Sequence, residues 1–67
     1  MSSTVEEVRR LQQKLHYCRW KIRKFEVYWS EQKLKGTKNT VVYAEKSIKA
    51  YEELADECLR RIGELIG

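Results

Sequence analysis

The fold of this 67-residue chain is decided by residues 41–65, which read VVYAEKSIKAYEELADECLRRIGEL. Apolar or nearly apolar residues recur there in alternating steps of three and four. This heptad pattern is typical of a helix that buries one stripe against other helices. The stripe consists of Val41, Ala44, Ile48, Tyr51, Ala55, Cys58, Ile62 and Leu65. Leu54, Leu59 and Ile66 widen it beyond a two-stranded seam, which favours a helical bundle.

The same pattern is present earlier in the chain, between residues 8 and 32. Its positions are Val8, Leu11, Leu15, Cys18, Ile22, Phe25, Trp29 and Gln32, and all but the last are apolar. Two amphipathic helices are therefore expected, and their two stripes are the natural surfaces through which they pack.

The limits of the two helices follow from capping residues. Ser3 and Thr4 are candidate N-caps, and Gly36 is of the type that ends a helix in the left-handed conformation, so the first helix is predicted at about 4–35. Residues 36–39 are the turn signal, after which Asn39 or Thr40 caps a second helix at about 40–66. A turn this short makes the helices antiparallel neighbours. The expected fold class is thus all-α, a two-helix antiparallel hairpin in one domain, 1–67.

Two helices cannot enclose both stripes, so we expect the hairpin to dimerise into a coiled-coil-like four-helix bundle. Assembly of the dimer with a further partner is the alternative. The side chains expected in the core and the dimer contact are Leu11, Leu15, Ile22, Phe25, Trp29, Ile48, Tyr51, Ile62 and Leu65.

Composition excludes several classes of function. Charged residues make up 36% of the chain and Pro is absent, as in long helices. The N-terminus lacks the apolar segment of a signal peptide, and the longest apolar run, Val41–Ala44, is too short to span a membrane. A cytoplasmic protein without a membrane partner is expected.

The sequence offers little for catalysis. It has one His, no glycine-rich phosphate loop and no nucleophile with an evident base, so we expect no enzyme activity and no cofactor. The spacing of Cys18 and Cys58 matches no metal site or redox pair. Two buried, reduced thiols are the preferred interpretation, although their similar height in the hairpin leaves a disulfide as the alternative.

The face of the first helix opposite its apolar stripe is unusual. Tyr17, Trp20, Val27 and Leu34 form a second, thinner apolar line there, and basic residues accompany it. Arg, Tyr and Trp are enriched in binding hot spots. The predicted partner-binding residues are His16, Tyr17, Trp20, Arg23, Lys24 and Val27. The alternative is that Trp20 packs inside a larger assembly.

Charge is distributed unevenly along the chain. Residues 1–36 hold nine Lys or Arg against four Glu, and between Val8 and Phe25 there are seven basic residues and no acidic one. Such a stripe is also the footprint of a phosphate-binding surface. A cluster of acidic residues at a similar height on the second helix argues instead for a protein partner whose surface carries the opposite charge pattern. These acidic residues are Glu52, Glu53, Asp56 and Glu57.

In size and layout the chain resembles the small helical-hairpin dimers that plasmids and bacteriophages use as regulators, the Rop-like RNA-binding proteins among them. The resemblance covers the hairpin layout and no motif, and it implies an accessory regulator of that type. We interpret the sequence as a small non-enzymatic protein that binds and modulates a larger protein, as an adaptor or inhibitor. The alternatives are an RNA-binding bundle of Rop-like layout that uses the same face, and a purely structural oligomer.

Overall fold

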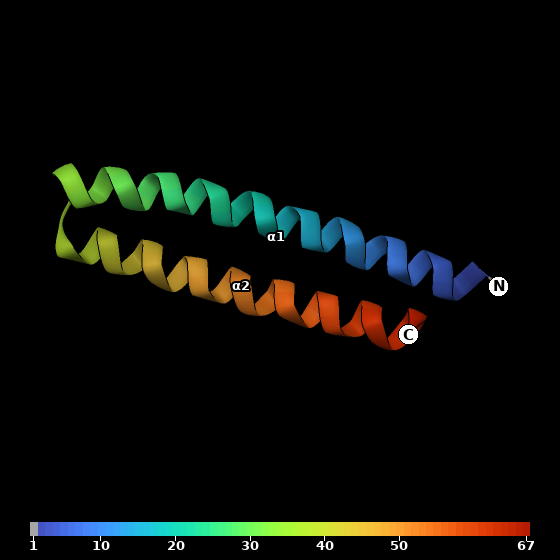
Figure 1. The fold of residues 1–67 in the computed structure, drawn as a ribbon. Helices are drawn as coiled ribbons and strands as arrows, with labels where there is room; N and C mark the ends of the chain where they lie inside the picture. Colours follow the sequence, from blue (N-terminus) through green and yellow to red (C-terminus); the bar gives the residue numbers. More distant parts are fainter. Residues whose placement is uncertain (1) are drawn as a thin grey trace.

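The computed structural model describes residues 2–67 as two α-helices, α1 (Ser2–Lys35) and α2 (Lys38–Ile66). The helices run antiparallel and side by side, with both termini at one end of the molecule (Figure 1). The hairpin is 52 Å long, and its other two dimensions are 14 and 13 Å. The predicted all-α hairpin is therefore confirmed. Within the described residues, neither helix has a stretch both long enough and apolar enough to cross a membrane.

The turn between the helices is shorter than the sequence predicted. Only Gly36 and Thr37 separate α1 from α2, and the expected cap at Asn39 or Thr40 is wrong. Thr37 is the N-cap: its side-chain oxygen accepts from the Thr40 backbone N–H at 3.3 Å, and its own backbone N–H donates to Thr40 Oγ1 at 3.1 Å. These reciprocal bonds satisfy two backbone donors at the start of α2 and fix the direction in which the helix leaves the turn.

The two ends of α1 also differ from the prediction. The helix already includes Ser2, so the candidate caps Ser3 and Thr4 lie inside it. At the other end, none of the described glycines has a positive φ, and the left-handed conformation expected for Gly36 is wrong. Its backbone N–H donates to the Gln32 carbonyl at 2.8 Å, which continues the helical bonding pattern by one residue. A side chain here would meet Thr40 Oγ1 at 2.7 Å, so glycine is favoured by the lack of space.

The core between the helices is small. The buried side chains are Leu15, Cys18, Ala44, Ala55 and Cys58. All but Ala44 form one cluster near the middle of the hairpin, against which Leu11, Tyr51 and Leu54 pack. The other predicted core residues, Ile22, Phe25, Trp29, Ile48, Ile62 and Leu65, are only partly buried. Two helices touch along one line, so side chains at the margins of the stripes keep part of their surface in solvent.

Polar contacts tie the helices together at both ends. Near the turn, Trp29 Nε1 donates to Glu45 Oε2 at 3.1 Å, and the Lys33 ammonium lies 4.6 Å from the centre of the Trp29 ring. Near the termini, the Arg61 guanidinium bridges Glu7 of α1, at 3.2 Å, and Glu64 of its own helix, at 3.3 Å. The hydrogen bond to the Glu64 carboxylate, and to a smaller extent the one to Glu7, raises the pKa of Arg61. All these groups are partly or largely exposed, so each contact adds little stability but helps to fix the alignment of the helices.

Candidate functional site

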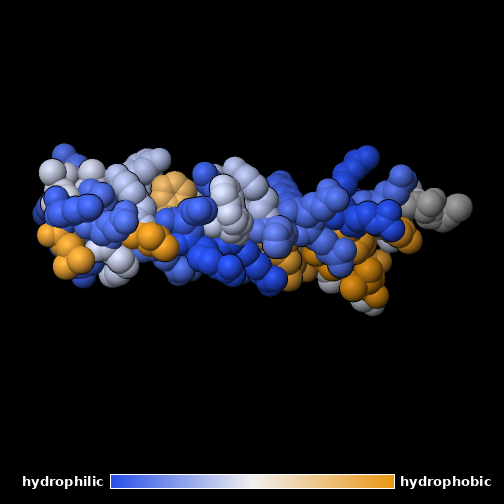
Figure 2. Space-filling model, turned by 90° about the horizontal axis from the view of Figure 1, so that it is seen from above, coloured by the Kyte–Doolittle hydropathy of each residue, from blue (hydrophilic) through white to orange (hydrophobic). Residues whose placement is uncertain are grey.

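The outer face of α1 exposes the apolar side chains that the sequence placed there. Tyr17 and Trp20 are 50% and 49% exposed, and Val27 and Leu34 are 58% and 90% exposed. Three of them, Trp20, Val27 and Leu34, are seven residues apart, so they form a straight line opposite the contact with α2. Seen from above α1, the surface is mostly hydrophilic with separate hydrophobic areas (Figure 2). Large exposed apolar side chains on such a surface are candidates for a binding contact.

Trp20 is at the centre of a group of rings and cations. Its ring centre lies 6.1 Å from that of Tyr17, and the two planes are tilted by 35°. The ammonium groups of Lys24 and Lys21 lie 5.5 and 5.8 Å from the same ring. Both distances are within the range of cation–π attraction, which costs little to form because the lysine stems lie along the helix surface. The indole is thus held at the surface by its neighbours without being buried by them.

Open hollows lie on both sides of Trp20. One, of about 280 Å³, is lined by Trp20, Arg23, Lys24 and Val27. The other, of about 330 Å³, is lined by His16, Arg19, Trp20 and Arg23. Trp20 and Arg23 border both hollows and form the wall between them. A partner could therefore contact the Trp20 indole from both hollows and place acidic groups against the surrounding cations.

The basic residues around this site are not neutralised by the rest of the described chain. The ion pairs among residues 2–67 involve Arg60 with Glu57, and Arg61 with Glu7 and Glu64. None of the basic side chains between Arg9 and Lys24 is among them. The acidic residues at a similar height on α2 are exposed but do not reach these cations. The outer face of α1 consequently keeps its positive charge available for a partner.

The six predicted partner-binding residues lie on one exposed surface. His16, Arg23 and Lys24 are exposed, like Tyr17, Trp20 and Val27, and five of the six line the two hollows. Tyr17 joins them through its contact with Trp20. Arg19 and Lys21 also belong to the site but were not predicted. Their positions one residue before and after Trp20 could have indicated them, because long basic side chains reach sideways over a neighbouring ring.

A second aromatic surface continues from Tyr17 across to α2. The Tyr51 ring meets the rings of Tyr17 and Phe25, and the Tyr43 ring meets those of Phe25 and Tyr28, with centres 5.8 to 6.4 Å apart. Lys21 lies over this series, 5.3 Å from the centre of Phe25 and 5.8 Å from that of Tyr51. The pKa of Tyr51 is raised, mainly because its hydroxyl is partly desolvated and also because Tyr17 lies beside it. We call Tyr17, Phe25, Tyr28, Tyr43 and Tyr51 the aromatic face.

The two cysteines lie in the core cluster as free, buried thiols. The pKa of Cys18 is raised, mainly by burial of the thiol and to a smaller extent by the neighbouring Cys58, whereas Lys14 acts in the opposite direction. A raised pKa keeps the thiol protonated and poorly nucleophilic at neutral pH. Within residues 2–67, no three His, Cys, Asp or Glu side chains gather in a way that could hold a metal ion.

Comparisons with known proteins add no family to this description. No family model, no curated protein and no solved structure matches the chain.

Proposed function

We propose that this chain is a small non-enzymatic regulatory protein that binds a larger protein through the outer face of α1. One observation carries the proposal: a half-exposed Trp20 separates two open hollows and is surrounded by cations that have no carboxylate partner. The centre of the site is formed by Tyr17, Trp20, Arg23 and Lys24, with His16 and Val27 at its border.

The geometry favours a partner with a recess and an acidic rim. An aromatic anchor at the centre of a contact commonly contributes about 2 kcal/mol or more, whereas charges at its border act mainly on association rate and orientation. Trp20 would enter the recess, and Arg23 and Lys24 would face the acidic rim. Because a helix presents these groups in fixed relative positions, little ordering is needed on binding. A protein of this kind acts by occupying or bridging a surface, as an inhibitor or an adaptor does.

Self-association is part of the proposal. The hairpin exposes 5356 Å², whereas a compact monomer of its 8.1 kDa mass would expose about 4,500 Å². The excess of roughly 850 Å² is close to the ~800 Å² that each partner buries in a stable protein–protein contact. Leu15 is also the only large aliphatic side chain in the buried set of the described residues. A second hairpin would supply the missing burial and give the predicted four-helix bundle.

The proposal is tested by capturing partners from a cell lysate with the wild-type chain and with Trp20→Ala. We expect the variant to bind its partner roughly thirtyfold more weakly, with unchanged helix content and oligomer mass, because about 2 kcal/mol corresponds to that factor. Tyr43→Ala is the matched control, since Tyr43 is 58% exposed but lies on α2. Normal binding by Trp20→Ala, or equal losses in both variants, would contradict the proposed site.

The exposed charges beside Trp20 make a separate prediction about salt. Arg23→Glu should slow association at low ionic strength, and the difference from wild type should shrink as salt is added, because salt screens exposed charges. A salt-independent loss of binding would indicate that Arg23 makes a buried contact with the partner and does not act through exposed charge.

RNA is the second candidate partner, and the unpaired basic residues between Arg9 and Lys24 are the observation that favours it. Phosphates would contact these cations, and an unpaired base could stack on Trp20. Nuclease treatment of the lysate separates the two proposals. A protein that remains captured after nuclease supports a protein partner, whereas recovery that depends on intact nucleic acid supports RNA.

A further inference from the structure

The two long sides of the hairpin differ in character. One side carries the aromatic face, whose rings contact one another, and the Lys21 ammonium lies over two of them, Phe25 and Tyr51. The opposite side carries aliphatic side chains, because the alternate positions of each heptad point to opposite sides of the contact line. We call this second group the aliphatic face; its members are Val8, Ile22, Ile48, Leu59, Ile62 and Ile66. All are partly or largely exposed, since none is among the buried residues.

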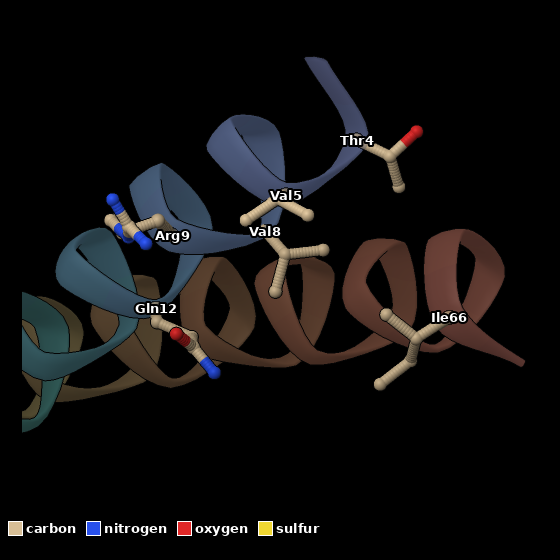
Figure 3. Close-up of a pocket in the computed structure, with 6 residues that line it drawn as sticks. All are labelled: Thr4, Val5, Val8, Arg9, Gln12 and Ile66. Carbon is tan, nitrogen blue, oxygen red and sulfur yellow. The ribbon is translucent and has the colours of Figure 1, made fainter. Parts of the chain in front are cut away.

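The aliphatic face is hollowed at one end. Figure 3 shows Val5 and Val8 of α1 and Ile66 of α2 around an open hollow of about 240 Å³ near the termini. Val5 and Ile66 are 58% and 69% exposed. Apolar side chains from both helices therefore meet solvent on the same side, and Arg9 and Gln12 of α1 also line the hollow. This side is the one that a second apolar surface would fit.

Charge at the middle of the hairpin decides how a second copy would lie. Arg19 stands three residues before Ile22 on α1, and Glu52 stands four residues after Ile48 on α2, so helical spacing places each beside the aliphatic face. Both are exposed, and neither makes an ion pair with another described residue. They lie at a similar height, because the Tyr51 ring contacts both Tyr17 and Phe25. Each is also close to the midpoint of its helix. These two residues are thus at the centre of any fully overlapping dimer built on this face.

Two symmetric arrangements bring the aliphatic faces of two copies together over their full length. With the loops at opposite ends, α1 lies on α1 of the other copy, so Arg19 meets Arg19 and Glu52 meets Glu52. With the loops at the same end, α1 lies on α2 of the other copy, so Arg19 meets Glu52 twice. Like charges opposed across an interface are unfavourable, and opposite charges select the orientation. The second arrangement also brings the apolar hollows of the two copies together at the termini.

We propose that the aliphatic face binds a second copy of this chain in one orientation, with both loops at the same end and α1 of each copy against α2 of the other. The proposal rests on the self-association described above and not on the external partner. It leaves Trp20 and the aromatic face on the outside of the bundle, while Arg19, which lines one hollow beside Trp20, turns towards the second copy.

The orientation is tested by measuring the distance between spin labels in the dimer. A label on Lys38→Cys, in the first turn of α2, reports on the loop end; Cys18 and Cys58 are buried, so the new cysteine reacts first. Helices pack about 8–10 Å apart, so two loops at the same end put the labels less than about 30 Å apart. Loops at opposite ends would separate them by about the 52 Å length of the hairpin. A label on Glu53→Cys, halfway along α2, gives a short distance in either case and is the control.

The pairing of Arg19 with Glu52 is tested by exchanging the two charges. Arg19→Glu and Glu52→Arg should each weaken the dimer by about ten- to thirtyfold, because two symmetric contacts change from attraction to repulsion. The double variant should recover most of the wild-type affinity. In the arrangement with opposed loops, the double variant would still face like charges and would show no recovery. Circular dichroism of each variant at low concentration verifies that the hairpin itself remains helical.

The choice of face is tested with Leu59→Ser, which should weaken the dimer at least about tenfold because each dimer loses two buried leucines. Tyr43→Ser, on the aromatic face and 58% exposed against 46% for Leu59, should leave the dimer unchanged. The reverse result would move the dimer contact to the aromatic face and overturn the proposal. A dimer with labels near 52 Å would overturn the orientation alone. A wild-type chain that stays monomeric in sedimentation equilibrium at millimolar concentration would instead overturn self-association itself.

Discussion

Substitution of two glycines by alanine is expected to change stability in opposite directions. Gly63 lies in the last turns of α2, and a Cβ built there meets nothing within 4 Å. Alanine loses less conformational freedom than glycine when a helix forms, which contributes about 0.5–1 kcal/mol. Gly63→Ala should therefore stabilise the hairpin by about that amount, and the added methyl group should leave the packing around it unchanged.

Gly36 lies beside the capping box at the start of α2. A Cβ there would overlap the side-chain amide of Gln32, which can rotate away, and would lie 2.7 Å from Thr40 Oγ1, which cannot. The Thr40 hydroxyl accepts from the Thr37 backbone N–H and donates to the Thr37 carbonyl at 2.9 Å, so displacing it breaks the cap. Loss of a cap costs about 1–2 kcal/mol, more than the stabilisation from the stiffer unfolded chain. Gly36→Ala should therefore destabilise the hairpin. The free energy of unfolding of this variant should be about 1–2 kcal/mol lower than that of Gly63→Ala.

The assay is thermal unfolding followed by circular dichroism, with all variants at the same chain concentration because the proposed association would make Tm concentration-dependent. For a chain of this length, 1 kcal/mol shifts Tm by about 4–8 °C. Gly63→Ala should raise Tm by a few degrees and Gly36→Ala should lower it. Adding Gly36→Ala to Thr40→Ala should cost little, since the cap is already lost. If Gly36→Ala stabilised the protein as much as Gly63→Ala does, the Thr37–Thr40 cap could not be holding the turn.

Two further predictions concern the contact between the helices. Ile22→Asp should dissociate the proposed dimer or unfold the hairpin, because an unpaired charge at an apolar contact is costly. Sedimentation would then show loss of the dimer mass, and circular dichroism would show loss of the helix signal. A variant with the mass, helix content and stability of the wild type would contradict this prediction. The raised pKa of Cys18 means that the folded state binds its thiol proton more tightly than the unfolded state. The free energy of unfolding should therefore decrease as pH rises above the ordinary thiol value of about 8.5, and Cys18→Ala should weaken this decrease. Melting on addition of reductant alone would show instead that Cys18 and Cys58 are joined.

The sequence by itself determines the hairpin and the exposed outer face of α1. Heptad spacing fixes the direction in which each side chain leaves its helix, and this direction hardly depends on the other helix. It therefore placed Leu15 towards α2 and Trp20 away from it, and the single turn signal near Gly36 made the helices antiparallel. The basic charge around Trp20 could also be read directly from the residues before Phe25.

Only the tertiary structure decided how the two helices are aligned along their length. That alignment depends on the turn, which Thr37 shortens to two residues through its cap with Thr40. Small shifts in the turn change which side chains meet, and the heptad pattern does not encode how far one helix is shifted along the other. The alignment brings Tyr17 and Phe25 to Tyr51. It also buries Leu15 and Cys18 while Ile22 stays partly exposed, because a pair of helices shields only the side chains nearest their line of contact.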